Sequence, residues 1–255
     1  MRKFILRIFR GTPGHQYWEE FEMELTPSLN VIEALLNIQR NPVNREGKVV
    51  EPITWEDGCL ECVCGSCSML INSKPRQACV SLIGNLLKET GTDVVTLAPF
   101  TKFPLVRDLV VNRDSMFENL KKVHAWLEVD GTYNPSGPSK ISQEKQEVLY
   151  SLSTCMTCGC CLEACPQVNE HSKFMGPQIM AQVRLFNAHP TGKLEKSKRI
   201  RPLMGPGGIQ DCGNAQNCVR VCPKKIPLTD AIAAIYRDVT IQMVRDLFSF
   251  PDREE

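Results

Sequence analysis

The sequence predicts an α+β protein in which a small mixed β-sheet domain is followed by an all-helical domain. Three observations support this prediction. Apolar residues alternate in short runs in the N-terminal part of the chain, as they do in half-buried strands. The C-terminal half lacks this alternation, and its apolar residues recur at helical spacing. The chain has 255 residues, which is enough for two domains of ordinary size.

Four short strands are expected in the N-terminal domain: residues 3–10, a run with alternating Phe21, Met23 and Leu25, residues 69–71 and residues 94–97. A helix should lie between the second and third strands, with one apolar face made of Val31, Ile32, Leu35 and Leu36. We expect Ser28 to cap this helix and Asn41, which precedes Pro42, to end it. The helix would then cover the sheet.

The C-terminal half is expected to be helical, beginning with a connecting helix at residues 114–127. The turn-rich segment at 130–138 is the best candidate for a linker. A long terminal helix is indicated by a stripe of Leu228, Ile232, Ile235, Val239, Met243 and Leu247, which we interpret as facing a core rather than a membrane surface. We therefore divide the chain into a sheet domain at residues 1–105, a connecting helix and linker at 106–144, and a helical domain at 145–255.

Composition narrows the class of protein. The net charge of +1 supplies no broad positive field, which argues against nucleic acid as a partner. No apolar run is long enough to span a bilayer, and basic residues interrupt the N-terminus before a signal-peptide core forms. We therefore expect a cytoplasmic chain. In such a chain, 13 cysteines indicate metal binding more than disulfides.

The first cysteine group has the plant-type spacing of a [2Fe-2S] cluster, C-x4-C-x2-C with a distant fourth thiol: Cys59, Cys64, Cys67 and Cys79. Each iron needs two thiolates, so a curved loop would supply three and a returning strand the fourth. Gly58 and Gly65 would let the backbone approach the sulfides, and Ser66 and Ser68 have hydroxyls that can donate to them. Cys62 lies inside the four-residue gap and is interpreted as a non-ligand.

The second group is the bacterial C-x2-C-x2-C-x3-C-P run: Cys155, Cys158, Cys161 and Cys165, followed by Pro166. In this motif the fourth cysteine serves the other cluster. The [4Fe-4S] cluster is therefore assigned to the first three thiols and to Cys222, which also precedes a proline. Cys160 lies between ligands and is interpreted as a buried non-ligand.

The third group equals a second copy of this run in which Ala215 replaces one cysteine. Only three thiols then remain for the last cluster: Cys165, Cys212 and Cys218. One corner has no thiolate, so the expected occupant is a [3Fe-4S] cluster. The alternative is a four-iron cluster with a non-cysteine ligand at that corner.

Other chemistries fit the sequence less well. Zinc also binds C-x2-C pairs, but these thiols have no simple division into zinc tetrads. The sequence shows no clear pairing of a nucleophile with a base, no phosphate-binding loop and no acidic dyad. The four histidines share no metal-ligand spacing: His15, His124, His171 and His189. A role near a cluster remained open for His189 alone, and catalysis is expected in a partner.

A plant-type site followed by crossed four-iron and three-iron sites resembles the iron-sulfur subunits of succinate dehydrogenases and fumarate reductases, over essentially the whole chain. Further segments look like the menaquinone-linked bacterial branch of that family: NPVN at 41–44, KPRQAC at 74–79, FPLVRD at 103–108, KFMGP at 173–177 and RLFNAHPTG at 184–192. The resemblance implies an N-terminal β-grasp plant-type ferredoxin domain and an all-α bacterial-ferredoxin-like domain.

The resemblance also implies a function. Electrons from succinate oxidation would leave FAD on a flavoprotein subunit, pass through the three clusters, and reach menaquinone at a membrane anchor. The sequence leaves open whether this anchor holds haem b. The chain would lie on the cytoplasmic side of the bacterial cell membrane, attached through the anchor. A fumarate reductase running in the opposite direction and a subunit of another flavin-linked dehydrogenase are the alternatives.

One family feature is absent. Ubiquinone-linked members place a tryptophan and a histidine near the three-iron cluster, whereas this sequence has Glu170 and Gly213 at those places. The departure argues against a ubiquinone pocket of that type and fits menaquinone. No quinone-binding residue is assigned.

Overall fold

The computed structural model describes residues 2–128 and 141–248 and divides the chain into two compact units. The first unit takes the residues up to Arg113 together with the separate segment Met156–Ala164. The second takes the described residues of Asp114–Cys155 and those from Cys165 onward. The predicted linker at 130–138 lies outside the described residues, and the predicted division at 105 and 144 stays a proposal beside this result.

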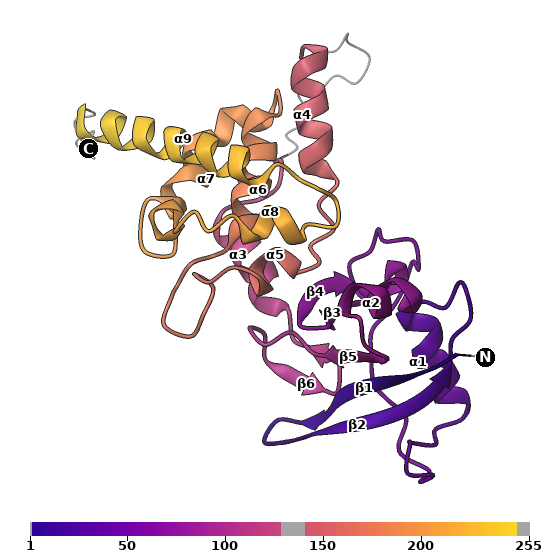
Figure 1. Cartoon of the computed structure of the whole chain (residues 1–255). Helices are drawn as coiled ribbons and strands as arrows, with labels where there is room; N and C mark the ends of the chain where they lie inside the picture. Colours follow the sequence, from indigo (N-terminus) through magenta and orange to yellow (C-terminus); the bar gives the residue numbers. More distant parts are fainter. Residues whose placement is uncertain (1, 129–140, 249–255) are drawn as a thin grey trace. The chain divides into compact units, whose positions relative to one another are not determined.

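The first unit is built on a five-stranded mixed sheet with the strand order β2-β1-β5-β3-β4 (Figure 1). Its strands are β1 (Lys3–Thr12), β2 (His15–Glu24), β3 (Ser68–Ile71), β4 (Lys74–Gln77) and β5 (Val94–Ala98). β1 pairs antiparallel with β2 and parallel with β5. Alternate residues of β1 are buried, which is the pattern that predicted this strand. β4 returns antiparallel beside β3 and ends two residues before Cys79, where the sequence analysis expected a returning strand.

Two helices pack their apolar faces into the core that covers this sheet. α1 (Val31–Arg40) was predicted, but its cap was not: the Asn30 side chain, and not Ser28, accepts the hydrogen bond from the Glu33 N–H. α2 (Ile83–Thr90) was missed; it ends at Gly91, whose φ of 67° favours glycine. A short 3-10 turn, η1 (Ala78–Val80), links β4 to α2 and carries Cys79, which the sequence analysis had placed on a strand.

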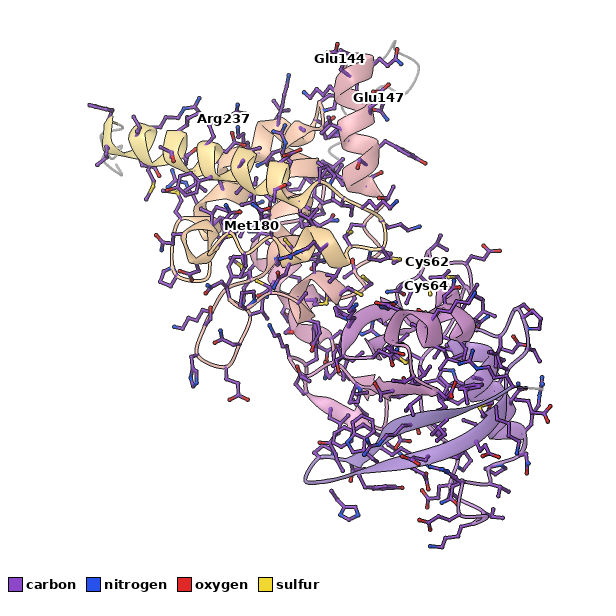
Figure 2. The ribbon with its side chains drawn as sticks, viewed as in Figure 1. Cys62, Cys64, Glu144, Glu147, Met180 and Arg237 are labelled. Atoms are coloured by element: carbon purple, nitrogen blue, oxygen red, sulfur yellow. The ribbon has the colours of Figure 1, made fainter. Side chains whose placement is uncertain are left out.

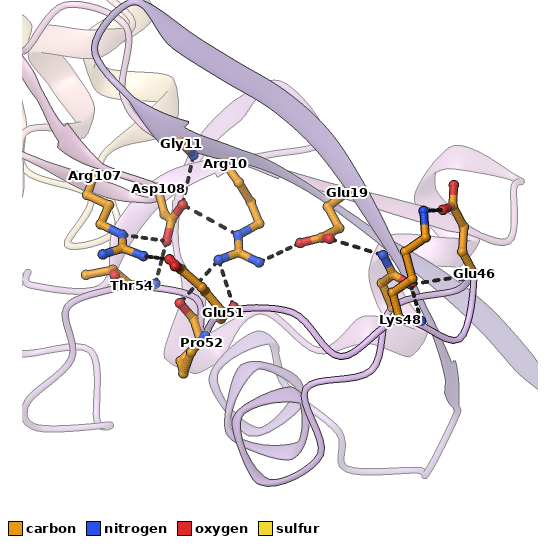
Figure 3. Close-up of polar contacts among 11 residues, drawn as sticks. Arg10, Gly11, Glu19, Glu46, Lys48, Glu51, Pro52, Thr54, Arg107 and Asp108 are labelled. Carbon is orange, nitrogen blue, oxygen red and sulfur yellow. Dashed lines mark hydrogen bonds and ion pairs between the residues drawn. The ribbon is translucent and has the colours of Figure 1, made fainter.

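A two-stranded hairpin of β6 (Leu105–Arg107) and β7 (Val110–Val111) is joined to the main sheet by a buried polar network (Figure 3). The Arg10 guanidinium lies 2.5 Å from Glu19 and 3.5 Å from Asp108, and all three side chains are almost fully buried. Asp108 also accepts hydrogen bonds from the backbone N–H groups of Gly11 and Thr54. The carboxylates thus compensate the buried cation, as burial requires.

The second unit is helical, and its described residues contain no strand, as predicted. Its helices are α3 (Asp114–Lys122), α4 (Gln143–Ser153), α6 (Pro177–Ala188), α7 (Lys196–Ile200), α8 (Asn217–Val221) and α9 (Leu228–Phe248). The 3-10 turns η2 (Gly192–Glu195), η3 (Arg201–Leu203) and η4 (Ile209–Asp211) connect them. α6 and α9 contribute much of the core. α5 (Cys160–Glu163) belongs to the first unit.

Two helix predictions need correction. The connecting helix ends at Lys122 and not at residue 127, because His124 adopts a positive φ of 48° and the chain turns there. The stripe on α9 faces the core as far as Val239, but Met243 and Leu247 are exposed. None of the helices in the described part of the chain is long and apolar enough to cross a membrane.

Candidate metal centres

The loop that carries the first cysteine group is shaped to hold a sulfur atom. The backbone N–H groups of Glu61, Val63 and Cys64 all donate to Cys59 Sγ, each at 3.3 Å. Positive φ angles at Leu60 and Cys62 curl the chain so that these groups converge. Such donors stabilise a thiolate more than a thiol, and the thiolate is the form that binds iron.

The four predicted two-iron ligands interact as two pairs. Hydrogen bonds from Ser66 and Cys59 lower the pKa of Cys64 to about 6. Burial raises the pKa of Cys67 to about 12; a backbone hydrogen bond at Cys79 lowers it, whereas the side-chain hydrogen bond with Cys79 raises it. Each iron of a [2Fe-2S] cluster takes two thiolates, so the pairs fit this group, and iron deprotonates a coordinating thiol outright.

Cys62 lies on the same loop as Cys64 (Figure 2). It is partly buried and packs against the core of the first unit. This packing is consistent with the prediction that Cys62 is not a ligand, which stays a prediction.

The middle of the bacterial run, Met156–Ala164, belongs to the first unit. Cys160 is fully buried there, and a hydrogen bond with it lowers the pKa of Cys158 to about 7, with a smaller contribution from the charge of Arg113. Gly159, at a φ of 85°, starts α5 and lies against the rings of Phe100 and Phe103. The burial of Cys160 agrees with its interpretation as a packed thiol.

The predicted four-iron ligands are distributed over both units. Cys158 and Cys161 lie in the first, whereas Cys155 and Cys222 lie in the second. Their assignment to one cluster therefore stays a prediction that rests on the spacing of the motif.

The predicted three-iron ligands come together in the second unit. Cys165, Cys212 and Cys218 line one cavity. The pKa of Cys218 is raised by burial and also by the neighbouring Cys165 and Cys212. Ala215, which stands where a fourth cysteine would be expected, lines the same cavity. Three converging thiols and one methyl group fit a cluster that lacks one iron.

A wider, polar hollow shares Gln167, Cys212 and Gly213 with this cavity. Its remaining lining is His171, Ser172, Lys173, Pro206, Gln210 and Asp211. A side chain at Gly213 would collide with Gln167, since a Cβ there would lie 2.6 Å from Gln167 Nε2. Gly213, noted for its departure from the ubiquinone-linked pattern, therefore leaves room for the end of the flexible Gln167 side chain, which would have to shift if a Cβ were present.

Two polar residues that the sequence analysis did not single out support the cluster motifs. Arg113 donates to the backbone oxygens of Gly65 and Ser66, at 3.0 and 2.7 Å. The buried Glu163 carboxylate accepts hydrogen bonds from the N–H and hydroxyl of Thr101 and from the N–H of Lys102. Both join segments far apart in the sequence, so no local pattern could have revealed them.

His189 has a structural role in the turn that follows α6. It follows the last turn of α6, and its Nδ1 accepts hydrogen bonds from the N–H groups of Thr191 and Gly192. Burial, and then the charge of Arg199, lowers the pKa of His189, which favours the neutral ring that accepts these bonds.

Comparisons with known proteins match both halves of the chain. The family model of a 2Fe-2S iron-sulfur cluster binding domain covers residues 5–118. The family model of a 4Fe-4S dicluster domain covers residues 151–226. The predicted order of a sheet-based two-iron domain and a helical domain with further clusters is thereby confirmed.

Whole-chain relatives give the same result. The succinate dehydrogenase iron-sulfur subunit of Bacillus subtilis is 55% identical over 246 residues, which is 96% of this chain and 95% of the relative. The fumarate reductase iron-sulfur subunit of Haemophilus influenzae is 28% identical over 83% of this chain and 86% of its own length. A chain of the Mycobacterium smegmatis Sdh1 complex in the apo form has the same fold, with a TM-score of 0.78, 22% identity, and coverage of 95% and 97%. This chain therefore belongs to the family of succinate dehydrogenase iron-sulfur subunits, the electron-transfer subunits of that enzyme.

Proposed function

We propose that this chain carries [2Fe-2S], [4Fe-4S] and [3Fe-4S] clusters and transfers electrons from a flavoprotein subunit to menaquinone at a membrane anchor. The convergence of Cys165, Cys212 and Cys218 on one cavity, with Ala215 at the position of a fourth ligand, carries this proposal. When bound, each cluster accepts and releases one electron at a time, which links two-electron flavin chemistry to stepwise quinone reduction.

The residues of the chain hold and tune these groups. Cys59, Cys64, Cys67 and Cys79 would bind the two-iron cluster, with the N–H donors around Cys59 stabilising its thiolate. Cys155, Cys158, Cys161 and Cys222 would bind the four-iron cluster. The largely buried positions of Cys165 and Cys218 would keep water away from the three-iron cluster. Solvent exposure and hydrogen bonds to sulfur are among the factors that set cluster potentials, so these surroundings matter for function.

The partners are inferred from the relatives. The sequence is 55% identical to the Bacillus subtilis subunit of succinate dehydrogenase, which supports a flavoprotein bearing FAD and a membrane anchor as partners. The anchor would hold the chain at the cytoplasmic face of the membrane and would supply any haem b of the complex. The polar hollow beside Cys212 lies next to the proposed three-iron site, where electrons would leave the chain.

A fumarate reductase is the second candidate, because fumarate reductase iron-sulfur subunits of Haemophilus influenzae and Wolinella succinogenes are 28% and 26% identical to this chain. The same chain of clusters can transfer electrons in either direction. The potentials of the clusters and of the quinone decide whether succinate is oxidised or fumarate is reduced. The higher identity to a succinate dehydrogenase subunit favours succinate oxidation.

Electron paramagnetic resonance on anaerobically prepared protein, with iron counted on the same sample, tests the proposal. We expect nine irons per chain, a three-iron signal in the oxidised sample and a two-iron signal on reduction. An oxidised sample without signal that contains ten irons would show that Ala215 does not exclude a fourth iron. Little iron in protein made with intact cluster assembly would overturn the electron-transfer proposal.

A further inference from the structure

Gln77, the last residue of β4, is a buried polar side chain between two cluster motifs. Its Nε2 donates to Ser68 Oγ at 2.7 Å and lies 3.6 Å from Cys160 Sγ. Its Oε1 accepts from Cys67 Sγ at 3.5 Å. Gln77, Ser68, Cys67 and Cys160 are all at most 3% exposed, so water does not compete for these contacts.

These contacts connect the two-iron site to the bacterial run within the first unit. Cys67 is a predicted two-iron ligand, and Cys160 directly precedes Cys161, a predicted four-iron ligand. The backbones also meet nearby: a Cβ on Gly65 would lie 2.7 Å from the Met156 oxygen and 3.0 Å from Cys158 Cα. Gln77 is therefore a side-chain link at a place where the two motifs are in direct contact.

Binding of iron by Cys67 would change the hydrogen bond between Cys67 and Gln77. As a free thiol, Cys67 donates its S–H to the amide oxygen of Gln77. As an iron ligand, Cys67 has no proton, so the same arrangement would set an oxygen acceptor against a thiolate acceptor. Rotating the amide by half a turn removes this conflict, because the NH₂ group then faces the Cys67 sulfur.

The other partners of Gln77 accommodate this rotation. The amide oxygen would then face the Ser68 hydroxyl, which has a hydrogen to donate, while the Cys160 thiol keeps its hydrogen bond with Cys158. Ser68 Oγ now donates to the Gly65 oxygen at 2.6 Å. That oxygen also accepts from Arg113 Nη1 at 3.0 Å, so it keeps a donor when the hydroxyl turns away. No buried polar group in this cluster is left without a partner.

We propose that Gln77 is a positioning residue shared by the two motifs, which donates an N–H···S hydrogen bond to Cys67 in the loaded protein and thereby raises the potential of the two-iron centre. The proposal rests on the proposed function, since it requires that Cys67 bind iron. Reduction adds negative charge to the centre, and a donor to its sulfur stabilises that charge. Hydrogen bonds to sulfur are among the factors that set cluster potentials.

The test is a redox titration of the two-iron signal by electron paramagnetic resonance, in the assembled complex. Gln77→Met keeps the length and apolar stem of the side chain and removes the N–H donor. We expect a lower two-iron potential, with the reduction equilibrium changed on the order of tenfold, or about 59 mV for one electron. Gln242→Met is the matched control, because Gln242 is a buried glutamine on α9 in the second unit.

A second readout follows the hydrogen bond itself. In protein labelled with ¹⁵N in glutamine side chains, pulsed resonance of the reduced two-iron centre should show a coupling that Gln77→Met removes and Gln242→Met retains. If Gln77→Met fails to assemble the two-iron centre, Gln77→Asn, which is one methylene shorter, replaces it and should also lower the potential.

Three outcomes have distinct meanings. A lowered potential in a Gln77 variant with the control unchanged supports the proposal. A retained two-iron signal at the native potential overturns it, and so does loss of that signal from both Gln77 variants, which would make Gln77 an assembly residue. Absence of the two-iron signal from the native protein would instead refute the proposed function.

Discussion

Gly65 lies where the loop of the first cysteine group packs closely against the backbone of the bacterial run, and the absence of a Cβ permits this close approach. Its φ of 78° favours glycine, and a Cβ there would lie 2.7 Å from the Met156 oxygen and 3.0 Å from Cys158. Gly91 has a similar φ of 67°, but a Cβ there would meet nothing within 4 Å. The two glycines therefore separate the cost of backbone strain from the cost of a steric collision.

We expect Gly65→Ala to lower the melting temperature of the full chain well beyond Gly91→Ala, and to reduce the iron bound per chain. Gly91→Ala carries only the strain of an alanine at positive φ, about 1 kcal/mol. Gly65→Ala adds a collision with backbone atoms, which cannot move aside as a flexible side chain can. Equal melting temperatures and iron contents for the two variants would contradict the close approach at Gly65.

Ala215 decides the iron content of the third cluster in the same direct way. We expect Ala215→Cys to supply a fourth thiolate in the cavity lined by Cys165, Cys212 and Cys218. The variant should bind one more iron than the native protein and lose the signal of the oxidised three-iron cluster. Ala215→Val, which adds volume without a ligand, is the control and should keep that signal. A Cys variant that also keeps it would show that another residue limits the cluster.

The cysteine ligands could be predicted from the sequence because cluster ligation imposes fixed spacings on a short stretch of chain. The roles of Gln77, Arg113 and Glu163 could not be predicted in this way. Gln77 contacts Cys160, 83 residues away, and Glu163 contacts Thr101, 62 residues away. Contacts over such separations are set by tertiary packing, and the residue types that make them are common on any protein surface.

At the scale of elements, β4 is tied to α2 by an ion pair on the surface. Arg76 Nη2 lies 2.7 and 2.8 Å from the two carboxylate oxygens of Glu89, and Lys74 Nζ also donates to Glu89. The hydrogen bond from Arg76, followed by that from Lys74, lowers the pKa of Glu89 to about 2. The pair is exposed, so it contributes little to the free energy of unfolding.

The pKa of Glu89 reports this link between β4 and α2. A lowered pKa means that the contribution of the pair is complete above the ordinary pKa of about 4.3 and is lost as the pH falls toward 2. We expect Arg76→Gln to raise the pKa of Glu89 toward that ordinary value in a carboxyl titration by NMR. Arg45→Gln, which removes an arginine bound to Glu20, should leave Glu89 unchanged. An unchanged Glu89 in Arg76→Gln would contradict the pairing.

The elements that the sequence predicted are those with strong periodicity. β1 has strict alternation of buried residues, and α1 has a continuous apolar face. α2 was missed because it has only 8 residues, with Ile83, Leu86 and Leu87 as its buried positions. The cap of α1 was misplaced because Ser28 and Asn30 both have suitable side chains, and only the hydrogen bond to Glu33 N distinguishes them.

At the scale of the whole molecule, the chain order and the compact units do not coincide. The segment Met156–Ala164 follows part of the helical unit in sequence, yet it belongs to the sheet-based unit. It brings the buried Cys160 to Gln77 and the Glu163 carboxylate to Thr101 and Lys102. The sequence could not reveal that this segment belongs to the first unit. A domain boundary predicted from turn residues assumes that each domain is one continuous stretch of chain.

Because Met156–Ala164 belongs to the first unit, we expect residues 1–113 to form an incomplete domain when expressed alone. Without Met156–Ala164, the nearly buried rings of Phe100 and Phe103 lose Gly159 as a neighbour, and the N–H groups of Thr101 and Lys102 lose Glu163. Each lost buried hydrogen bond costs about 1 kcal/mol or more. One such loss corresponds to roughly 4–8 °C in the melting temperature of a domain of this size.

The comparison is between residues 1–113 alone and the same fragment joined by a flexible linker to residues 156–164, both with the same metal content. We expect the joined fragment to melt at the higher temperature and to bind less of a dye that reports exposed apolar surface. Glu163→Ala in the joined fragment should remove part of the gain, because the carboxylate is the acceptor for three of the restored hydrogen bonds. Identical melting temperatures for the fragments would mean that residues up to Arg113 are complete in themselves. The boundary would then lie where a continuous domain would place it, and the segment around Cys160 would be an attachment and not a part of the fold.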